Sequence, residues 1–285
     1  MKIKIWGCRG SLTTPGKETL RYGGNTTCVE VRMRDGRVII LDAGSGLMNL
    51  GKALVAGQDL TLQMLLTHAH WDHLCGFPFF APAYLKQCQI TLCGGPAAQQ
   101  SLERYFKHQM EPPFFPVPFE GLQARLDFGC RCDHPCAGKL IAERGGPGCR
   151  SVRLNHPDGG YGFKLEEDGK SFVFLPDNEL RFHHANCPEF SEQVDFCRGA
   201  DLLFHDAQYT EADYQRTRGW GHSTYGDALR LATTARVKRL GLFHHDPART
   251  DDDLDRQIES CRRQLREAGS TVDCFACAEE MVIEL

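Results

Sequence analysis

The chain lacks the features that mark membrane-spanning, fibrous or disordered proteins. No apolar run is long enough to span a bilayer, and there is no low-complexity tract. No Pro/Ser-rich linker divides the 285 residues, a length that allows one large domain or two small ones. With 41% hydrophobic and 25% charged residues, the composition is that of a globular protein. We therefore expect a single domain over residues 1–285 and no membrane contact.

The chain also has little net charge. Its 33 Lys and Arg residues are nearly balanced by 37 Asp and Glu residues, which gives a formal net charge of −4. Such a balance provides no broad basic surface for a long polyphosphate backbone. A nucleic acid remains a candidate partner, but a small or locally bound substrate is favoured.

Cysteine is abundant, with 14 residues, yet we expect no disulfide framework. Such frameworks are typical of short secreted chains, whereas lysines interrupt the first residues here, MKIKIWGC. The expected location is therefore cytoplasmic, with most cysteines reduced and packed as small hydrophobes. Cys130, Cys132, Cys136 and Cys149 could instead bind a structural zinc ion in an insertion around residues 121–153, although incidental cysteine is favoured.

Hydrophobic periodicity predicts strands that occur both in hairpins and in alternation with helices. The predicted strands are 2–6, 27–33, 38–42, 60–66, 160–166, 171–175, 201–205 and 237–245, followed by a strand pair near the C-terminus. The predicted helices are 47–55, 97–109, 222–235 and 252–267. This mixture favours an α+β fold, an αββα sandwich of two mixed β-sheets with helices on the outer faces.

The strongest functional signal is the run THAHWDH at residues 67–73, directly after a predicted strand. It contains His68, His70, Asp72 and His73. Three imidazoles and a carboxylate so close in sequence can converge on cations only from a tight loop, because a strand or a helix would splay them. The end of a strand supplies such a loop, so the run predicts a metal centre.

Two closely spaced cations need about seven to eight protein contacts, so further ligands are expected at other strand ends. The candidates are His156 after SVRLN, Asp177 after FVFLP and His244 after LGLF. Each lies where an apolar strand stops and a loop begins. Several strands would then present their ligands along one rim of the fold.

On these motifs the chain resembles the metallo-β-lactamase superfamily of binuclear metallohydrolases. The match runs in order through LDAGSG, THAHWDH, LNHP, FLPD and LFHH. The resemblance implies that one divalent ion is held by His68, His70 and His156 and a second by Asp72, His73 and His244, with Asp177 bridging. We expect Zn²⁺, with Mn²⁺ or Fe as alternatives, and a homodimer. Asp42 in LDAGSG would orient the histidine loop without binding metal.

Two further motifs resemble the branch that contains tRNase Z and other phosphodiesterases. These are GHST at 221–224 and HDAQ at 205–208. The branch pairs an acidic residue with a histidine beside the metals, and here the pair would be Asp206 and His222. Asp206 stands where the branch typically has glutamate, and the HDPA after His244 also differs from tRNase Z. His222 could otherwise be only the residue at the start of a helix, capped by Ser223.

The implied chemistry is phosphodiester hydrolysis. Two divalent cations that share a water lower its pKa toward neutrality, which creates a hydroxide for in-line attack. The candidate catalytic residues are His222, which would protonate the leaving group, Asp206, which would keep it protonated, and Asp72. The predicted substrate is a small or cyclic phosphodiester or a nucleotide.

Two other functions remain open. The same ligands serve acyl hydrolysis in glyoxalase II thioesterases and some β-lactamases, which the metal motifs alone do not separate. A metal or redox sensor without turnover is the alternative of another class, based on the 130–149 cysteines and on Cys274 and Cys277. The latter pair lies in a predicted strand, where positions three apart point to opposite sides.

Aromatic residues near the first motif are candidate pocket walls. The run Phe114–Phe119 and the segment GFPFF could enclose a substrate, and a base could stack there. Phe77, Phe79 and Phe80 are otherwise expected to be core residues. The N-terminal loop around Arg9, Ser11 and Asn25 is a further candidate neighbour of the site.

Overall fold

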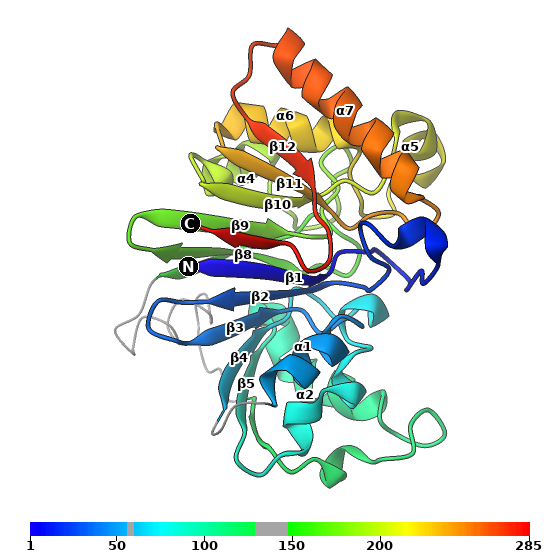
Figure 1. Ribbon diagram of the computed structural model, residues 1–285, viewed down its shortest axis with the longest axis vertical. Coiled ribbons are helices and arrows are strands. Elements are labelled where there is room, and N and C mark those ends of the chain that lie inside the picture. The colour runs from blue at the N-terminus through cyan, green and yellow to red at the C-terminus, as the bar shows by residue number, and fades with distance from the viewer. Residues whose placement is uncertain (56–59, 129–147) are drawn as a thin grey trace.

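The computed structural model describes residues 1–55, 60–128 and 148–285 (Figure 1). Two mixed β-sheets pack against each other, and helices cover both outer faces. The predicted αββα sandwich is therefore confirmed. Among the described helices, none is both long and apolar enough to cross a lipid bilayer.

The first sheet has the strand order β13-β1-β2-β3-β4-β5-β6. Its strands are β1 (Lys2–Gly7), β2 (Cys28–Arg32), β3 (Val38–Leu41), β4 (Thr61–Leu65), β5 (Gln89–Cys93), β6 (Arg125–Asp127) and β13 (Val282–Glu284). Strands β3 to β6 are parallel, whereas β13, β1, β2 and β3 pair antiparallel. Consequently β3, β4 and β5 end at the same edge of the sheet.

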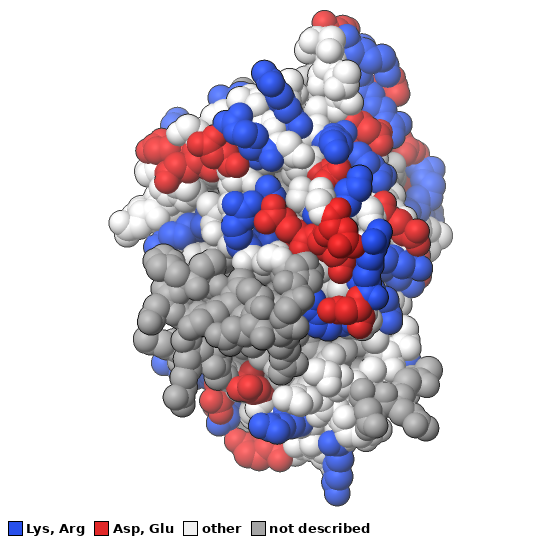
Figure 2. All heavy atoms as spheres, turned by 90° about the vertical axis from the view of Figure 1, so that its left-hand side faces the viewer, with Lys and Arg blue, Asp and Glu red and all other residues white. Residues whose placement is uncertain are grey.

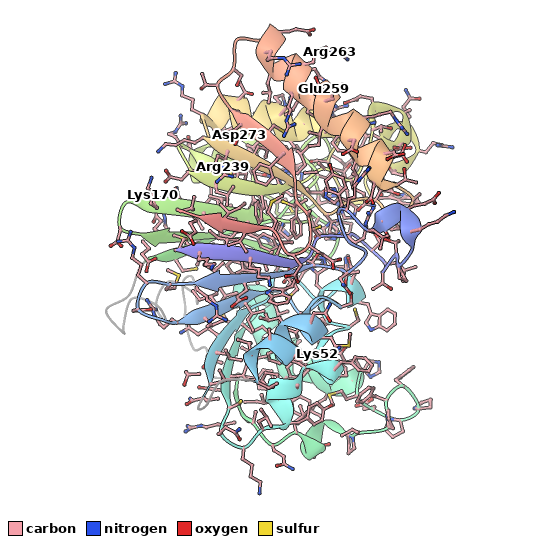
Figure 3. The ribbon with its side chains drawn as sticks, in the orientation of Figure 1. Lys52, Lys170, Arg239, Glu259, Arg263 and Asp273 are labelled. Carbon is pink, nitrogen blue, oxygen red and sulfur yellow. The ribbon has the colours of Figure 1, made fainter. Side chains whose placement is uncertain are left out.

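The second sheet has the order β12-β11-β10-β9-β8-β7. Its strands are β7 (Cys149–Arg153), β8 (Tyr161–Glu167), β9 (Lys170–Leu175), β10 (Leu202–Asp206), β11 (Arg239–Phe243) and β12 (Asp273–Ala276). Strands β9 to β12 are parallel, and β7, β8 and β9 form an antiparallel meander. Parallel register places Arg239 and Asp273 beside each other at the starts of β11 and β12 (Figure 3). Arg239 Nε lies 3.5 Å from Asp273 Oδ2.

Helices line the two outer faces. The helices of the first sheet are α1 (Leu47–Leu54) and α2 (Gly95–His108), and those of the second are α4 (Phe190–Cys197), α6 (Tyr225–Ala235) and α7 (Asp251–Glu267). Helix α5 (Glu211–Thr217) precedes α6. Short 3₁₀ helices occur at Lys17–Thr19, Trp71–His73, Phe77–Phe79, Ala81–Tyr84 and Phe119–Gly121.

Successive side chains of the buried strands point to opposite faces of each sheet, so the core consists of three clusters. In β9, Phe172 and Phe174 pack between the sheets, whereas Val173 and Leu175 pack beneath the helices of the second sheet. In the first sheet, Ile39 points between the sheets and Ile40 beneath α1 and α2. Because both sides of these strands are buried, they read as continuous apolar runs in the sequence.

The starts of α6 and α7 follow from capping boxes. Thr224 accepts a hydrogen bond from the Asp227 N–H, and Thr250 accepts one from that of Asp253, while each aspartate bonds back to its threonine. This Thr-x-x-Asp pattern satisfies N–H groups that a helix start leaves unpaired. Helix α6 therefore begins after Thr224, so His222 lies before the helix and not within it.

Several elements differ from the sequence prediction. Strands β5 and β6 and helices α4 and α5 were not predicted, and of β7 only the segment SVRLN before His156 was predicted as a strand. The two C-terminal strands do not pair with each other. β12 joins β11 in the second sheet, whereas β13 pairs with β1 in the first, so the termini lie side by side (Figure 1).

The cysteine predictions have separate outcomes. Cys130, Cys132 and Cys136 lie outside the described residues, and Cys149 is buried in β7. Cys274 packs in the cluster beneath the helices of the second sheet, whereas Cys277 packs in the cluster between the sheets. These two side chains point to opposite sides, as the strand geometry predicts, and cannot share a ligand without a change in the backbone.

Candidate metal centre

Loops at the ends of four strands bring the seven predicted metal-ligating side chains together. The loop after β4 carries His68, His70, Asp72 and His73. The loops after β7, β9 and β11 carry His156, Asp177 and His244, respectively. The strand ends of both sheets therefore meet along one rim, as the sequence motifs predict.

The seven side chains form two groups of potential ligands, and Asp177 and His244 form a third group with His222. The first group contains His68, His70, His156 and Asp177, the second contains Asp72, His73 and His244, and the ligand atoms within each group lie within 4.8 Å of one another. Asp177 lies between the groups. Its Oδ2 is 3.7 Å from the Nε2 atoms of both His68 and His156 and 3.3 Å from that of His244, and its Oδ1 is 3.1 Å from His73 Nε2.

The donor set fits divalent cations. His68 Nε2, His73 Nε2 and Asp177 Oδ1 are buried and make no hydrogen bond of acceptable geometry within the described residues. Buried polar atoms are normally paired, so three such atoms in one cluster indicate ligand atoms. Burial lowers the pKa of His156 to about 3 and that of His68 well below its usual value, so both rings are neutral and have a lone pair to offer.

Polar contacts on the far side of the rings orient these potential ligands. Asp42 accepts a hydrogen bond from His73 Nδ1 at 2.7 Å and two from Thr67, from its N–H at 2.7 Å and its Oγ1 at 2.9 Å. Thr67 Oγ1 in turn lies 3.0 Å from His68 Nδ1. Asp42 thus anchors two rings and leaves their Nε2 atoms pointing into the cluster, without itself entering it.

Similar contacts hold His156 and His244. His156 Nδ1 is 2.8 Å from the carbonyl oxygen of Gly221, and His244 Nδ1 is 2.8 Å from Gln208 Oε1. His244 has φ 58°, and Asp42 has φ 60°. Non-glycine residues adopt this left-handed conformation at a cost, and such strain concentrates at sites where the surrounding structure dictates side-chain direction.

Two glycines allow the close approach of loops to the histidine rings. A Cβ at Gly221, where φ is +93°, would lie 2.1 Å from His156 Nδ1, and a Cβ at Gly10 would lie 2.4 Å from His244 Nδ1. Neither distance is sterically possible without movement. Neither glycine was predicted as a site residue, although Gly221 belongs to the GHST motif.

Asp206 reaches His222 in spite of its short side chain. The distance from His222 Nδ1 to Asp206 Oδ2 is 2.8 Å, and Asp206 also accepts hydrogen bonds from the N–H groups of Asn178 and Gln208. The His222 ring stacks on that of His244, with 4.8 Å between centroids. Burial disfavours the protonated ring, but the charge and hydrogen bond of Asp206, together with the charges of Asp177 and Asp72, outweigh it and raise the pKa of His222 to about 9.

Glu179 supports the loop that carries His222. This fully buried carboxylate accepts hydrogen bonds from the N–H groups of Gly219 and Gly221, at 2.8 and 2.7 Å, and from the Tyr214 hydroxyl at 2.7 Å. Glu179 was not predicted from the sequence. It follows the predicted ligand Asp177 by two positions. Tyr214, Gly219 and Gly221 lie 35 or more residues away from it, so no local motif marks this carboxylate as the support of the loop.

The N-terminal loop also donates a hydrogen bond to the cluster. The Ser11 N–H donates a hydrogen bond of 2.8 Å to Asp72 Oδ2. Arg9 is fully buried and instead bonds the carbonyl oxygens of Gly23, Asp246 and Arg249, so it ties the loop to the segment after His244. Asn25 bonds Glu279 and Ser45. Of the three residues named from the sequence, only Ser11 contacts the cluster.

Comparison with known families agrees with this geometry. Residues 37–245 match the family model of the β-lactamase superfamily domain, a span that includes all seven clustered side chains. The chain belongs to the metallo-β-lactamase superfamily. A relative named ribonuclease Z, from Brevibacillus brevis, is 30% identical over 232 residues, which cover 69% of this chain and 72% of the relative. The chain is thus a metal-dependent hydrolase related to the ribonuclease Z proteins.

Solved structures share the metallo-β-lactamase fold. A diphosphatase from the PhnP family has a TM-score of 0.66 at 18% identity, with 100% of this chain and 97% of that chain covered. The short form of human tRNase Z has a TM-score of 0.61 at 20% identity, with 100% and 99% covered. At these identities the structural likeness is one of fold.

Two pockets of this metallo-β-lactamase fold include residues of the loop after β4. The aromatic pocket, about 650 Å³, is lined by Trp71, Pro78, Phe79, Gln109, Phe114 and Phe115, among others. The polar pocket, about 440 Å³, is lined by His68, His70, Tyr105, Arg153, Asp158 and Tyr161, among others. Phe77 and Phe80 are core residues as expected, but Phe79 is not, because it is 57% exposed.

Proposed function

We propose that this hydrolase is a binuclear phosphodiesterase that cleaves a small or cyclic phosphodiester or a nucleotide. The observation that carries the proposal is the contact between His222 and Asp206 beside a cluster of five histidines and two aspartates. A cluster of ligands alone is compatible with many hydrolytic reactions. A histidine held in its protonated form next to it adds a proton donor, which a poor leaving group such as an alkoxide requires.

The seven side chains would hold two divalent cations. His68, His70 and His156 would bind one, Asp72, His73 and His244 the other, and Asp177 both. Nitrogen and carboxylate donors suit Zn²⁺, with Mn²⁺ and Fe as alternatives. When bound, such ions activate water for attack and neutralise the charge that develops on phosphoryl oxygens.

His222 has the position and the charge of a general acid. Its Nδ1 is committed to Asp206, so Nε2 is the atom from which a proton can be delivered. His222 Nδ1 lies 4.0 Å from Asp177 Oδ2, so the ring forms part of the wall of the cluster. Asp206 is itself held by two backbone N–H groups, which keep the carboxylate aimed at the ring.

Charge and pocket size support a small substrate. On the face shown in Figure 2, which is the side where β1 and β9 begin and not the side of the clustered side chains, basic and acidic side chains are interspersed among the described residues. The chain as a whole has more acidic than basic residues. A long nucleic acid needs many phosphate contacts, whereas a small phosphodiester needs only the centre and its neighbouring pockets.

RNA cleavage is the second candidate function. It is favoured by the name ribonuclease Z that several relatives of this chain share. A precursor RNA would be cleaved at the same centre, because its scissile bond is also a phosphodiester. The two candidates therefore differ in how the substrate is held and not in the chemistry.

A substrate panel tests the proposal. The metal-loaded protein is assayed with bis(p-nitrophenyl) phosphate, cyclic nucleotides, a set of thioesters and a precursor tRNA. We expect turnover of the small phosphodiesters and little or none of the thioesters. Preference for the precursor tRNA by orders of magnitude in kcat/KM would favour the second candidate. Thioester hydrolysis without phosphodiester hydrolysis, or binding of metal without any turnover, would contradict both.

A further inference from the structure

The aromatic pocket has chemistry that hydrolysis at the metal centre does not use. We propose that it binds the nucleobase of the substrate, which makes the substrate class nucleoside phosphates. This inference rests on the proposed function. It is carried by three observations: exposed aromatic faces gathered at one cavity, an unpaired carboxamide in its wall, and a shared loop with the metal ligands.

The exposed rings at the pocket form a stacking surface. Trp71, Phe79 and Phe114 are 69%, 57% and 67% exposed, and all three line this cavity. Phe79 packs edge-on against Phe115, with 5.3 Å between centroids, and Phe114 packs against His108 at 5.7 Å. Large apolar side chains grouped at one cavity indicate a binding site, and planar bases stack on such rings.

Gln109 adds a polar requirement that an aliphatic ligand would not satisfy. It follows the last residue of α2, and it lines the same pocket. Both amide atoms, Nε2 and Oε1, are buried and have no hydrogen-bond partner within residues 1–55, 60–128 and 148–285. An unpaired buried amide is unfavourable, so the side chain would gain by turning toward a ligand that offers an acceptor and a donor side by side.

A nucleobase meets that requirement, whereas an acyl chain does not. The edges of the bases present neighbouring donors and acceptors, and a glutamine amide can pair with both at once, as with adenine N6 and N7. A fatty acyl group would cover the aromatic rings but leave the amide unpaired. The combination of stacking faces and one carboxamide therefore favours a base over a purely apolar group.

The position of Trp71 links the pocket to the reaction. Trp71 lies between His70 and Asp72 in the sequence. The short 3₁₀ helix Trp71–His73 and the residue before it therefore carry both the indole that lines the pocket and three of the clustered side chains. A base in the pocket would place its own sugar and phosphate toward the cluster. Binding energy from the base would then position the phosphate for attack.

The test compares two ligands that differ by the base alone. Calorimetry on the metal-loaded protein measures the Kd of ribose 5-phosphate and of the 5′-monophosphates of adenosine, guanosine, cytidine and uridine. We expect at least one nucleotide to bind tenfold or more tightly than ribose 5-phosphate. The ratio measured is the Kd of ribose 5-phosphate divided by the Kd of the nucleotide. Trp71→Ala and Gln109→Leu should each reduce that ratio about tenfold, with little change in the Kd of ribose 5-phosphate.

Two control variants separate the pocket from general damage. Trp71→Phe keeps a stacking ring and should retain most of the ratio. Gln264→Leu makes the same substitution on the exposed side of α7, away from the pocket, and should leave it unchanged. If Trp71→Ala disturbs the metal ligands, the Kd of ribose 5-phosphate will rise. The ratio measured for Gln109→Leu then decides whether the pocket binds the base.

The outcomes for the pocket and for the proposed function differ. A ratio near one in the wild-type protein, or a high ratio that neither pocket variant lowers, would overturn the nucleobase site. Turnover of bis(p-nitrophenyl) phosphate together with that result would leave the phosphodiesterase proposal standing. Nucleotide binding that depends on Trp71 and Gln109, without cleavage of any phosphodiester, would contradict the phosphodiesterase proposal and support the pocket.

Discussion

The carboxylate of Asp206 lies 2.8 Å from His222 Nδ1, and the same His222 ring stacks on the ring of His244. Sixteen residues separate Asp206 and His222 in the chain. Their contact joins the end of β10 to the loop before α6, beside the clustered potential ligands. The pair is therefore built into the rim that carries the proposed metal centre, which makes its chemistry testable by substitution.

Replacing His222 should affect substrates according to their leaving groups. His222→Ala removes the proposed proton donor, and general acid catalysis typically contributes about 10²- to 10⁴-fold. We expect kcat to fall by that range for a phosphodiester with an alkyl leaving group. The fall should be much smaller for bis(p-nitrophenyl) phosphate, because p-nitrophenolate leaves without protonation. Equal losses on both substrates, with metal content unchanged by elemental analysis, would remove the acid role.

Asp206 should set the alkaline limit of activity. Its negative charge raises the pKa of His222, so a larger fraction of the ring is protonated at a given pH. Asp206→Asn removes that charge, lowers the pKa of His222 and should shift the alkaline limb of the kcat/KM profile to lower pH. Asp206→Glu keeps the charge and serves as the matched control. An alkaline limb that stays in place in Asp206→Asn argues against His222 as the titrating acid.

Gly221→Ala should weaken metal binding through His156. The added Cβ would lie 2.1 Å from His156 Nδ1, so either the loop or the ring must move. We expect a lower metal content per chain after dialysis and a loss of activity of about tenfold or more, since displaced outer contacts of metal ligands cost about 10- to 100-fold. Gly36→Ala is the control, because Gly36 has φ +86° but a Cβ added there would meet no atom within 4 Å. An equal loss of metal in Gly221→Ala and Gly36→Ala would show that backbone strain alone lowers the metal content.

Removal of metal should lower thermal stability. The cluster buries ligand atoms that have no hydrogen-bond partner among the described residues, so ions that bind only the folded state stabilise it. At a free ion concentration of about 100 Kd the gain is about 2.7 kcal/mol. A gain of this size corresponds to a rise in Tm of roughly 5–10 °C for a chain of this size. Calorimetric scans before and after chelation, and after addition of Zn²⁺ or Mn²⁺, measure it; an unchanged Tm would argue against a metal centre in this cluster.

Much of the fold and of the cluster could be predicted from the sequence because the relevant signals are local. Strands buried on both sides appear as apolar runs, as in β9 with Phe172 to Leu175. His68, His70, Asp72 and His73 lie within six residues, so their density alone indicates ligands. His156, Asp177 and His244 each follow an apolar run and could be found in the same way.

What the tertiary structure alone decided depends on contacts between distant segments. His244 Nε2 lies 3.2 Å from Asp72 Oδ2 across 172 residues, and Gly221 supports His156 across 65. No local pattern shows that Glu179 carries the loop of His222, or that Phe79 is exposed while Phe77 is buried. Residue types and local periodicity determine which side chains can bind a metal and which strands can form. The packing of two sheets determines which strand ends meet, because only that packing brings the loops of both sheets to one rim.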